Sequence, residues 1–245
     1  MSWQWPEEPT PPQWRTLSVI VPVYDERETL AEIVRRIRSV DLSALFLTTE
    51  ILLVDDGSTD GTRDLLPGLA ELPGVRVLLL PHNQGKGAAV RTGIQHARGD
   101  FLLVQDADLE YDPRDYPVLL RPILEGRSAV VYGSRFLGEH KAMYFWHQVG
   151  NKLLTTIANI LYNTTLTDME TCYKLCTREV ARSFTLKQDR WGFDPEMTAK
   201  ILKRGHRIYE VPISYNGREF DDGKKINWRD ALIVIAALIR YRFTE

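Results

Sequence analysis

Five short apolar runs, each followed by a polar or glycine-rich stretch, constrain the fold of this chain more than any other feature. The runs cover residues 17–23, 51–54, 75–80, 101–104 and 129–132. Helical patterns lie between them, and the clearest covers residues 27–40, where apolar residues follow the i, i+3, i+4, i+7 spacing. This alternation predicts an α/β fold: a mostly parallel central sheet, joined by right-handed crossovers and flanked by helices, in a single domain.

The stretches that follow the runs indicate where a ligand would bind. They read PVYDE, DDGSTDGT, HNQGKG, DADLE and GSR. In an open parallel sheet, ligands bind outside the carboxyl ends of the strands. We therefore expect the five stretches to meet at one edge of the sheet and to form the site there.

Composition limits the classes of function. The chain has 245 residues, 44% of them hydrophobic, and a formal charge of -2, which argues against wrapping nucleic acid. Cys172 and Cys176 are too few for a disulfide framework and are expected to be buried, reduced thiols. The chain begins without an apolar signal segment, and its longest apolar run, residues 231–239, is shorter than the roughly twenty residues of a membrane span. We expect a cytoplasmic protein without a transmembrane helix.

The two ends of the chain differ from its middle. Residues 1–16 combine prolines with tryptophans and are expected to form an extended tail before a globular domain over residues 17–226. Within that domain, residues 146–162 predict a long helix. Residues 227–245 are expected to form a C-terminal amphipathic helix, which could dock on the protein's own core, lie at a membrane interface or pair with a partner subunit.

The DADLE stretch carries the strongest chemical signal. Asp106, Asp108 and Glu110 follow a buried strand, and alternating side chains of an extended segment point in the same direction. Because clustered carboxylate oxygens bind hard divalent cations, the stretch predicts a Mg²⁺ or Mn²⁺ site that leaves positions for water and substrate phosphates. The alternative is a solvated acidic turn before a helix.

Two further stretches supply groups for a nucleotide. VDDGS places Asp55 and Asp56 at another strand end, where a carboxylate can accept hydrogen bonds from a base N–H or a ribose hydroxyl. HNQGKG does not satisfy the P-loop pattern, but it places Lys86 at the start of a helix, a position that suits a phosphate group. A simple loop-to-helix junction is the alternative for this stretch.

Basic residues follow in GSRF and in NGREFDDGKK. Arg135 comes directly after the fifth run, and Arg218, Lys224 and Lys225 belong to a glycine-containing loop. Each charge alone would be explained as solvated surface. Beside a metal site they are candidates for clamps on phosphate oxygens, with arginine acting as a planar fork and lysine as a point charge.

In combination, the motifs are similar to those of a known family. SVIVPVYDERETL, ILLVDDGSTDGT, NQGKGAAVRTG, DADLE, GSRF and GRE occur in the family's order over residues 17–230. On these motifs the chain resembles the family 2 glycosyltransferases of GT-A (Rossmann-like) fold, and within them the dolichyl-phosphate and polyprenyl-phosphate sugar synthases. The resemblance implies inverting, metal-dependent transfer of a sugar from a nucleoside diphosphate sugar, of the GDP-mannose or UDP-glucose type, to a polyprenyl or dolichyl phosphate.

The resemblance also implies roles for individual residues. Together with Lys86, the nucleotide-sugar site would comprise Pro22, Tyr24, Glu26, Val54, Asp56, Asp106, Ala107, Asp108, Arg218 and Lys224. Asp108 would bind Mg²⁺ or Mn²⁺ directly, with Asp106 and Glu110 as the other metal ligands. Asp108, Arg135 and Lys224 would be catalytic, because metal and cations stabilise the charge that develops on the leaving diphosphate.

The acceptor side departs from the family in one position. Arg135, with Ser134 beside it, matches a basic residue near the acceptor phosphate, but relatives present a second arginine in a W-x-x-x-R pattern. Here Gly150 stands four residues after Trp146. His147 or Lys152 is then the candidate for the missing cation.

The acceptor decides whether a general base is needed. A phosphate monoester has a second pKa of about 6 and is already a nucleophile at neutral pH. A soluble acceptor that attacks through a hydroxyl would need a base, for which Asp168, Glu170 and Glu196 are candidates. A non-catalytic nucleotide-sugar-binding module is a third reading. A lipid acceptor further implies peripheral contact with the inner face of a membrane, or a membrane-protein partner.

Overall fold

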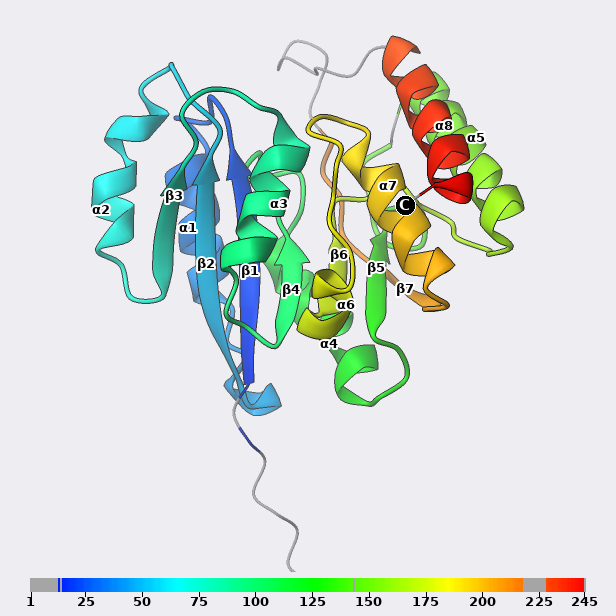
Figure 1. Ribbon diagram of the computed structural model, residues 1–245. Helices are drawn as coiled ribbons and strands as arrows, with labels where there is room; N and C mark the ends of the chain where they lie inside the picture. Colours follow the sequence, from blue (N-terminus) through cyan, green and yellow to red (C-terminus); the bar gives the residue numbers. More distant parts are fainter. Residues whose placement is uncertain (1–12, 14, 143, 218–227, 245) are drawn as a thin grey trace, which may run out of the picture.

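The computed structural model describes residues 13, 15–142, 144–217 and 228–244, and these residues form a seven-stranded sheet flanked by helices (Figure 1). The strands are β1 (Arg15–Val23), β2 (Leu47–Asp55), β3 (Val75–Leu79), β4 (Phe101–Val104), β5 (Val130–Ser134), β6 (Lys174–Thr177) and β7 (Ile208–Pro212). Their order across the sheet is β3-β2-β1-β4-β6-β5-β7. The predicted α/β fold with a mostly parallel sheet is confirmed.

One strand, β6, runs against the others. It pairs antiparallel with β4 on one side and with β5 on the other, whereas the remaining pairs are parallel. The sequence analysis did not predict this strand. Its consequence is that the first residue of β6, Lys174, lies at the edge of the sheet where the parallel strands end.

The central strands are buried on both faces, as their apolar runs predict. All residues of β4 and β5 are buried, and so are six of the nine residues of β2, namely Leu47 and Ile51 to Asp55. β3 differs, because it is an edge strand and only Val75 is fully buried. β1 begins at Arg15, so the last two residues of the predicted tail belong to the sheet; residues 1–12 and 14 lie outside the described part.

Helices cover both faces of the sheet (Figure 1). The helices are α1 (Leu30–Ser39), α2 (Leu66–Ala70), α3 (Lys86–His96), α4 (Tyr116–Leu124), α5 (Phe145–Tyr162), α6 (Arg178–Arg182), α7 (Phe193–Lys203) and α8 (Trp228–Phe243). Helix α3 contacts both α6 and α7 on one face, and α1 lies behind the sheet in the view. Short 3₁₀ turns occur at Ser43–Leu45, Thr62–Asp64 and Pro113–Asp115.

The C-terminal helix α8 packs against the protein itself. It contacts α5 and α7, and α5 and α8 lie side by side (Figure 1). Val234 and Leu238 of α8 form a small apolar cluster with Leu154, Ala158 and Met169. Within the described ranges, we find no helix that is both long and apolar enough to cross a membrane.

Candidate active site

The motif loops meet at one edge of the sheet. β1, β2, β3 and β4 run parallel, so the loops that follow them emerge together. Lys174 at the start of β6 pairs with Tyr132 near the end of β5. The segment before β6, residues 167–173, therefore lies beside the loops that follow β4 and β5. The motif loops thus meet at one edge of the sheet, as expected, and residues 167–173 lie beside them.

The two acids at the end of β2, Asp55 and Asp56, hold the neighbouring loops in place. Asp55 is fully buried and accepts hydrogen bonds from the backbone N–H groups of Gly57 and Ser58 and from Arg63 Nε at 2.6 Å. Both oxygens of Asp56 accept backbone N–H groups, those of Gln84 and Gly85, at 2.7 Å each. Asp56 thus fixes the loop that leads to Lys86.

The loop after β1 is joined to the same region. Glu26 donates its backbone N–H to Thr62 Oγ1, and its carboxylate accepts a hydrogen bond from Thr29 Oγ1 at 2.6 Å. Pro22 and Tyr24 are partly exposed beside it. Val54 pairs in register with Pro22, but its side chain is completely buried in the core. Asp56, also expected near the base and ribose, is buried as well, whereas Pro22, Tyr24 and Glu26 are partly exposed.

The DADLE stretch is a turn and not an extended segment. β4 ends at Val104, residues 107–110 turn, and Leu109 adopts a positive φ of 64°. The expectation that three carboxylates point one way by alternation is wrong, because the turn gives them different partners. Asp106 contacts Lys86, while Glu110 accepts a hydrogen bond from the hydroxyl of Tyr215 at 2.8 Å. Asp108 Oδ1 accepts the backbone N–H of Glu110, which closes the turn.

Lys86 and Asp106 form a half-buried ion pair. Lys86 Nζ lies 2.5 Å from Asp106 Oδ1. It is also 6.0 Å from the ring centre of Trp191 and 5.8 Å from that of Phe193, within the range of cation–π contacts. Burial alone would lower the pKa of Lys86, but the charge of Asp106 and weaker effects of its other neighbours, including Asp194, together raise the pKa above its usual value. Lys86 is therefore a permanent cation at the first turn of α3.

The donor atoms of the turn suit a divalent cation. In the part of the chain that the structure describes, we find no group of three His, Cys, Asp or Glu side chains placed to enclose a metal. Mg²⁺ and Mn²⁺ commonly bind only one or two carboxylates and take their other ligands from water and phosphates. Asp106 and Asp108, two carboxylates on one turn at the edge of the sheet, fit that manner of binding.

Arg135 is held by Asp168. Its Nε and Nη2 atoms donate to the two carboxylate oxygens at 2.7 and 2.8 Å, and its backbone N–H donates to Oδ2. Both residues are buried. Burial alone would lower the pKa of Arg135, but the charge of Asp168 raises it well above its usual value. The ring centre of Tyr215 lies 5.3 Å from the guanidinium carbon of Arg135. The hydroxyl of Tyr215 donates a hydrogen bond to Glu110.

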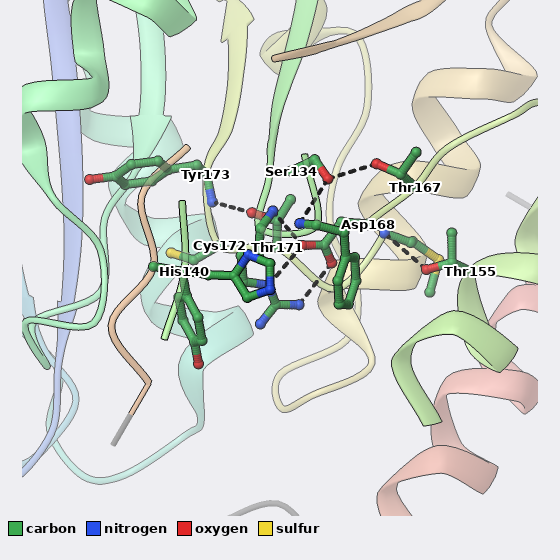
Figure 2. A network of polar contacts seen from close by, with 12 residues as sticks. Ser134, His140, Thr155, Thr167, Asp168, Thr171, Cys172 and Tyr173 are labelled. Carbon is green, nitrogen blue, oxygen red and sulfur yellow. Dashed lines mark hydrogen bonds and ion pairs between the residues drawn. The ribbon is translucent and has the colours of Figure 1, made fainter. Parts of the chain in front are cut away.

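The remaining residues of the expected acceptor site are more dispersed. Ser134 is fully buried, and its hydroxyl bonds to that of Thr167 at 2.7 Å, close to Asp168 (Figure 2). His147 and Lys152 both belong to α5, where Lys152 Nζ lies 5.7 Å from the ring centre of Phe136. Ser134 thus supports the loop, Lys152 lies near Phe136, the residue after Arg135, and His147 contacts the ring of Tyr144.

The three candidates for a general base have different surroundings. Both carboxylate oxygens of Asp168 accept hydrogen bonds from Arg135. Glu196 accepts hydrogen bonds from Lys187 N, Gln188 N and Lys200 Nζ. Glu170 differs, because its buried Oε1 atom has no hydrogen-bond partner among the described residues. Burial raises the pKa of Glu170 to about 7, with the charge of Asp194 adding to the effect. Of the three, only Glu170 is left to act on a ligand.

The structure adds residues that the sequence analysis did not assign. Lys174 Nζ lies 2.5 Å from Asp194 Oδ1, and both residues are almost completely buried. The sequence shows both charges, but the pairing depends on β6 and the first turn of α7 coming together. The expected thiols Cys172 and Cys176 are indeed buried and free. Arg218, Lys224 and Lys225 lie outside the described residues.

Comparison with known families identifies the class of protein. The family model described as glycosyl transferase family 2 matches residues 18–184. This match covers the sheet up to β6 and every motif loop discussed above except the glycine-containing loop after β7. The chain belongs to glycosyltransferase family 2, and it is a glycosyltransferase.

Individual relatives are similar over most of the chain. Glycosyltransferase AglJ of Haloferax volcanii is 32% identical over 237 residues, which is 95% of this chain and 73% of the relative. Dolichyl-phosphate beta-glucosyltransferase ALG5A of Trichomonas vaginalis is 31% identical over 222 residues, 85% of this chain and 67% of the relative. The chain thus spans about two thirds to three quarters of the length of these relatives.

Solved structures support the fold. Glucosyl-3-phosphoglycerate synthase from Mycobacterium tuberculosis, in complex with Mn²⁺, uridine diphosphate and glucosyl-3-phosphoglycerate, superimposes with a TM-score of 0.69 at 20% identity. The match covers 93% of this chain and 80% of that one. The complex of the same enzyme with Mn²⁺, UDP-glucose and phosphoglyceric acid gives a TM-score of 0.70 at 21% identity. At this level of identity the likeness establishes the GT-A type of fold.

Proposed function

We propose that the protein transfers a sugar from a nucleoside diphosphate sugar to a polyprenyl or dolichyl phosphate, with inversion at the anomeric carbon and with Mg²⁺ or Mn²⁺ bound. Two of its relatives carry the name dolichyl-phosphate beta-glucosyltransferase, at 31% and 34% identity. A solved structure of the same fold holds Mn²⁺ and uridine diphosphate together. UDP-glucose and GDP-mannose are the donors to be tested first.

The donor diphosphate would bind at the turn after β4. Asp106 and Asp108 would hold the cation, which offsets the negative charge that develops on the departing diphosphate. Lys86 adds a fixed positive charge beside Asp106, at the N-terminus of α3, where backbone N–H groups also favour a phosphate. Asp56 keeps this loop in place through Gln84 and Gly85. Lys224 and Arg218 stay expectations, because they lie outside the described residues.

The acceptor phosphate would bind near Arg135. An oxygen of the acceptor phosphate attacks the anomeric carbon while the bond from that carbon to the diphosphate oxygen breaks. The nucleoside diphosphate leaves, and the sugar is joined to the lipid phosphate with inverted configuration. Because a phosphate monoester is largely ionised at neutral pH, this route needs no general base. Arg135, oriented by Asp168, would draw the phosphate toward the donor.

The observation that carries a lipid acceptor is the apolar surface of α5 and α8. On α5, Trp146, Val149, Leu153 and Ile160 follow helical spacing and are exposed, Trp146 by 78%. On α8, Leu232, Ile239 and Phe243 also follow helical spacing and are exposed, and 80% of the surface of Phe243 is accessible to solvent. The two helices lie side by side, and basic residues Arg240 and Arg242 belong to the last turn of α8. Such surfaces suit peripheral contact with a membrane that holds the prenyl chain.

The test is a transfer assay with the whole chain. Labelled UDP-glucose or GDP-mannose is mixed with a polyprenyl phosphate and Mn²⁺ or Mg²⁺, and label is counted after extraction into organic solvent. The proposal expects metal-dependent label in the organic phase, and loss of that label in Asp108→Ala. Release of nucleoside diphosphate without label in the lipid would contradict the acceptor.

A soluble acceptor is the second candidate. The neighbour in the solved structures is a glucosyl-3-phosphoglycerate synthase, and its complexes contain a small phosphorylated acid. An acceptor that attacks through a hydroxyl requires a base, and Glu170 has a carboxylate oxygen available for that role. Water-soluble labelled product formed in the absence of lipid would favour this second candidate.

A further inference from the structure

Seven charged side chains gather around the start of β6, and six of them form pairs. Lys86 pairs with Asp106, Lys174 with Asp194, and Arg135 with Asp168, at distances from 2.5 to 2.7 Å. The seventh is Glu170. Within the described part of the chain, no cation lies within ion-pair distance of its carboxylate.

Glu170 belongs to a segment whose other polar groups are satisfied. Asp168, two residues earlier, has both oxygens bonded to Arg135. The carbonyl oxygen of Thr171, the next residue, accepts a hydrogen bond from Lys174 Nζ, and the Thr171 hydroxyl accepts one from the backbone N–H of Tyr173. Glu170 Oε1, by contrast, is a buried atom that lacks a partner among the described residues. The segment is therefore rigid on both sides of one unsatisfied carboxylate.

Two other glutamates, half-buried Glu210 and fully buried Glu196, show how a purely structural carboxylate is bonded. Glu210 accepts hydrogen bonds on both oxygens from Thr167, and on one from the backbone of Asp168. Glu196 is likewise bonded on both oxygens. Burying a carboxylate oxygen without a partner costs free energy, so such an atom is rare in a folded protein unless a ligand completes it.

Glu170 lies in the chain between members of two ion pairs. Asp168, two residues before it, pairs with Arg135, and Lys174, four residues after it, pairs with Asp194. The charges of these four residues also act on the carboxyl group of Glu170, and Asp194 in turn acts on Lys86 of the proposed donor clamp. Glu170 is thus near both Arg135 and the proposed donor clamp, where the sugar would be during transfer.

We propose that Glu170 binds a hydroxyl group of the donor sugar, and that this hydrogen bond supplies the missing partner of its buried Oε1 atom. The proposal rests on the proposed function, because it takes the donor to be a nucleoside diphosphate sugar. A carboxylate can accept from a sugar hydroxyl, and hydrogen bonds to charged groups are stronger than those between neutral groups. Glu170 would then distinguish the sugar from the bare nucleotide.

The acidity of Glu170 is consistent with this role. Burial, followed by the charge of Asp194, raises its pKa to about 7, whereas Lys174 and Arg135 act in the opposite direction. Near neutral pH the carboxyl is therefore divided between its charged and neutral forms. The charged form accepts a hydroxyl hydrogen bond more strongly, so sugar binding should strengthen from pH 6 to pH 8.

The experiment compares a nucleotide with and without its sugar. Dissociation constants of UDP-glucose and of UDP are measured by calorimetry, with Mn²⁺, for the wild-type chain, Glu170→Ala and Glu170→Gln. Glu179→Gln, at an exposed position on α6, is the matched control. GDP-mannose and GDP replace these ligands if the wild-type chain prefers them.

The expected result is selective. Glu170→Ala should weaken UDP-glucose binding about tenfold or more, the range of a lost hydrogen bond to a charged group, and leave UDP within twofold. Glu170→Gln should lose less, because its amide oxygen still accepts a hydrogen bond, and its binding should no longer vary between pH 6 and pH 8. Glu179→Gln should match the wild type.

Two results would overturn the proposal in different ways. If Glu170→Ala and Glu170→Gln bind UDP-glucose as tightly as the wild type, or weaken UDP and UDP-glucose equally, Glu170 does not hold the sugar. If the wild-type chain binds neither sugar nucleotide, the proposed function fails, and the role of Glu170 fails with it. The Gln variant keeps the shape of the side chain, so the test does not depend on how well the Ala variant folds.

Discussion

Arg135 and Asp168 face each other as a two-pronged ion pair, with Nε–Oδ2 and Nη2–Oδ1 distances of 2.7 and 2.8 Å, in the interior of the protein. The pair joins the end of β5 to the segment that precedes β6. Glu210 of β7 accepts the backbone N–H of Asp168 and so holds the acid in place. The cation that we place at the acceptor phosphate is thus oriented by structure and not by the ligand alone.

Removing Asp168 should destabilise the fold. Asp168→Ala leaves Arg135 as a buried cation without a partner, and breaking a buried pair in this way typically costs about 3–5 kcal/mol. Urea unfolding of the variant and the wild type measures the difference. Glu32→Ala, which breaks an exposed pair with Arg35 on α1, is the control and should change stability much less. Equal effects of the two substitutions would contradict the importance of the buried pair.

Lys86 should matter for the nucleotide more than for the fold. Lys86→Met removes the positive charge beside Asp106 but keeps an apolar stem against Trp191 and Phe193. We expect UDP binding with Mn²⁺ to weaken about tenfold, the effect of losing about 1.4 kcal/mol of interaction. Lys203→Met is the control, because Lys203 ends α7 and contacts Thr244, away from the edge with the motif loops. Unchanged UDP affinity in Lys86→Met would exclude the phosphate role.

The raised pKa of Glu170 predicts how the free energy of unfolding depends on pH. Its pKa is raised from 4.5 to about 7, so the folded chain binds a proton more readily than the unfolded chain. The contribution of this group to stability is therefore complete below pH 4.5 and is lost as the pH rises through 7. Glu170→Gln removes the titration, and its stability relative to the wild type should increase between pH 5 and pH 8.

Urea unfolding at pH 5 and pH 8 measures this effect. Other titrating groups are common to both chains, so they cancel in the difference between the variant and the wild type. Glu179→Gln should show the same difference at both values of pH. A constant difference for Glu170→Gln would mean that the carboxyl group titrates normally in the folded chain.

Exposed apolar residues of α5 should govern membrane contact. Trp146→Ser removes the most exposed aromatic side chain of that helix. We expect a smaller fraction of this variant to sediment with vesicles that contain anionic lipid, because less apolar surface enters the interface. Leu79→Ser, which changes an exposed residue of the edge strand β3, should sediment like the wild type. Equal loss in both variants would indicate unspecific adhesion.

The fold was predictable where apolar runs record burial directly. Residues 101–104 are entirely apolar and form the fully buried strand β4. β6 has four residues and begins with Lys174, whose charge is compensated only by Asp194 from a distant helix, so no local pattern indicates a strand. The antiparallel direction of β6 also depends on pairing with β4 and β5, which are far away in sequence.

The site was predictable in its residue types but not in its pairings. The motifs indicate that Asp56, Asp106 and Arg135 belong at one edge. At the turn, where Leu109 has a positive φ, Asp106 contacts Lys86 and Glu110 contacts Tyr215. Alternation of residue types along the sequence does not predict such a turn. Asp56 likewise binds the backbone of a loop that follows another strand. These contacts arise only when the sheet brings separate loops together.

The most direct test of the acceptor offers two acceptors to the whole chain in one reaction. A polyprenyl phosphate in detergent and phosphoglyceric acid in water are present together with labelled sugar nucleotide and Mn²⁺. Our account predicts that label enters the organic phase, that it depends on the metal, and that phosphoglyceric acid does not reduce it. Label confined to the aqueous phase as a glycosylated acid would contradict a lipid phosphate as the acceptor.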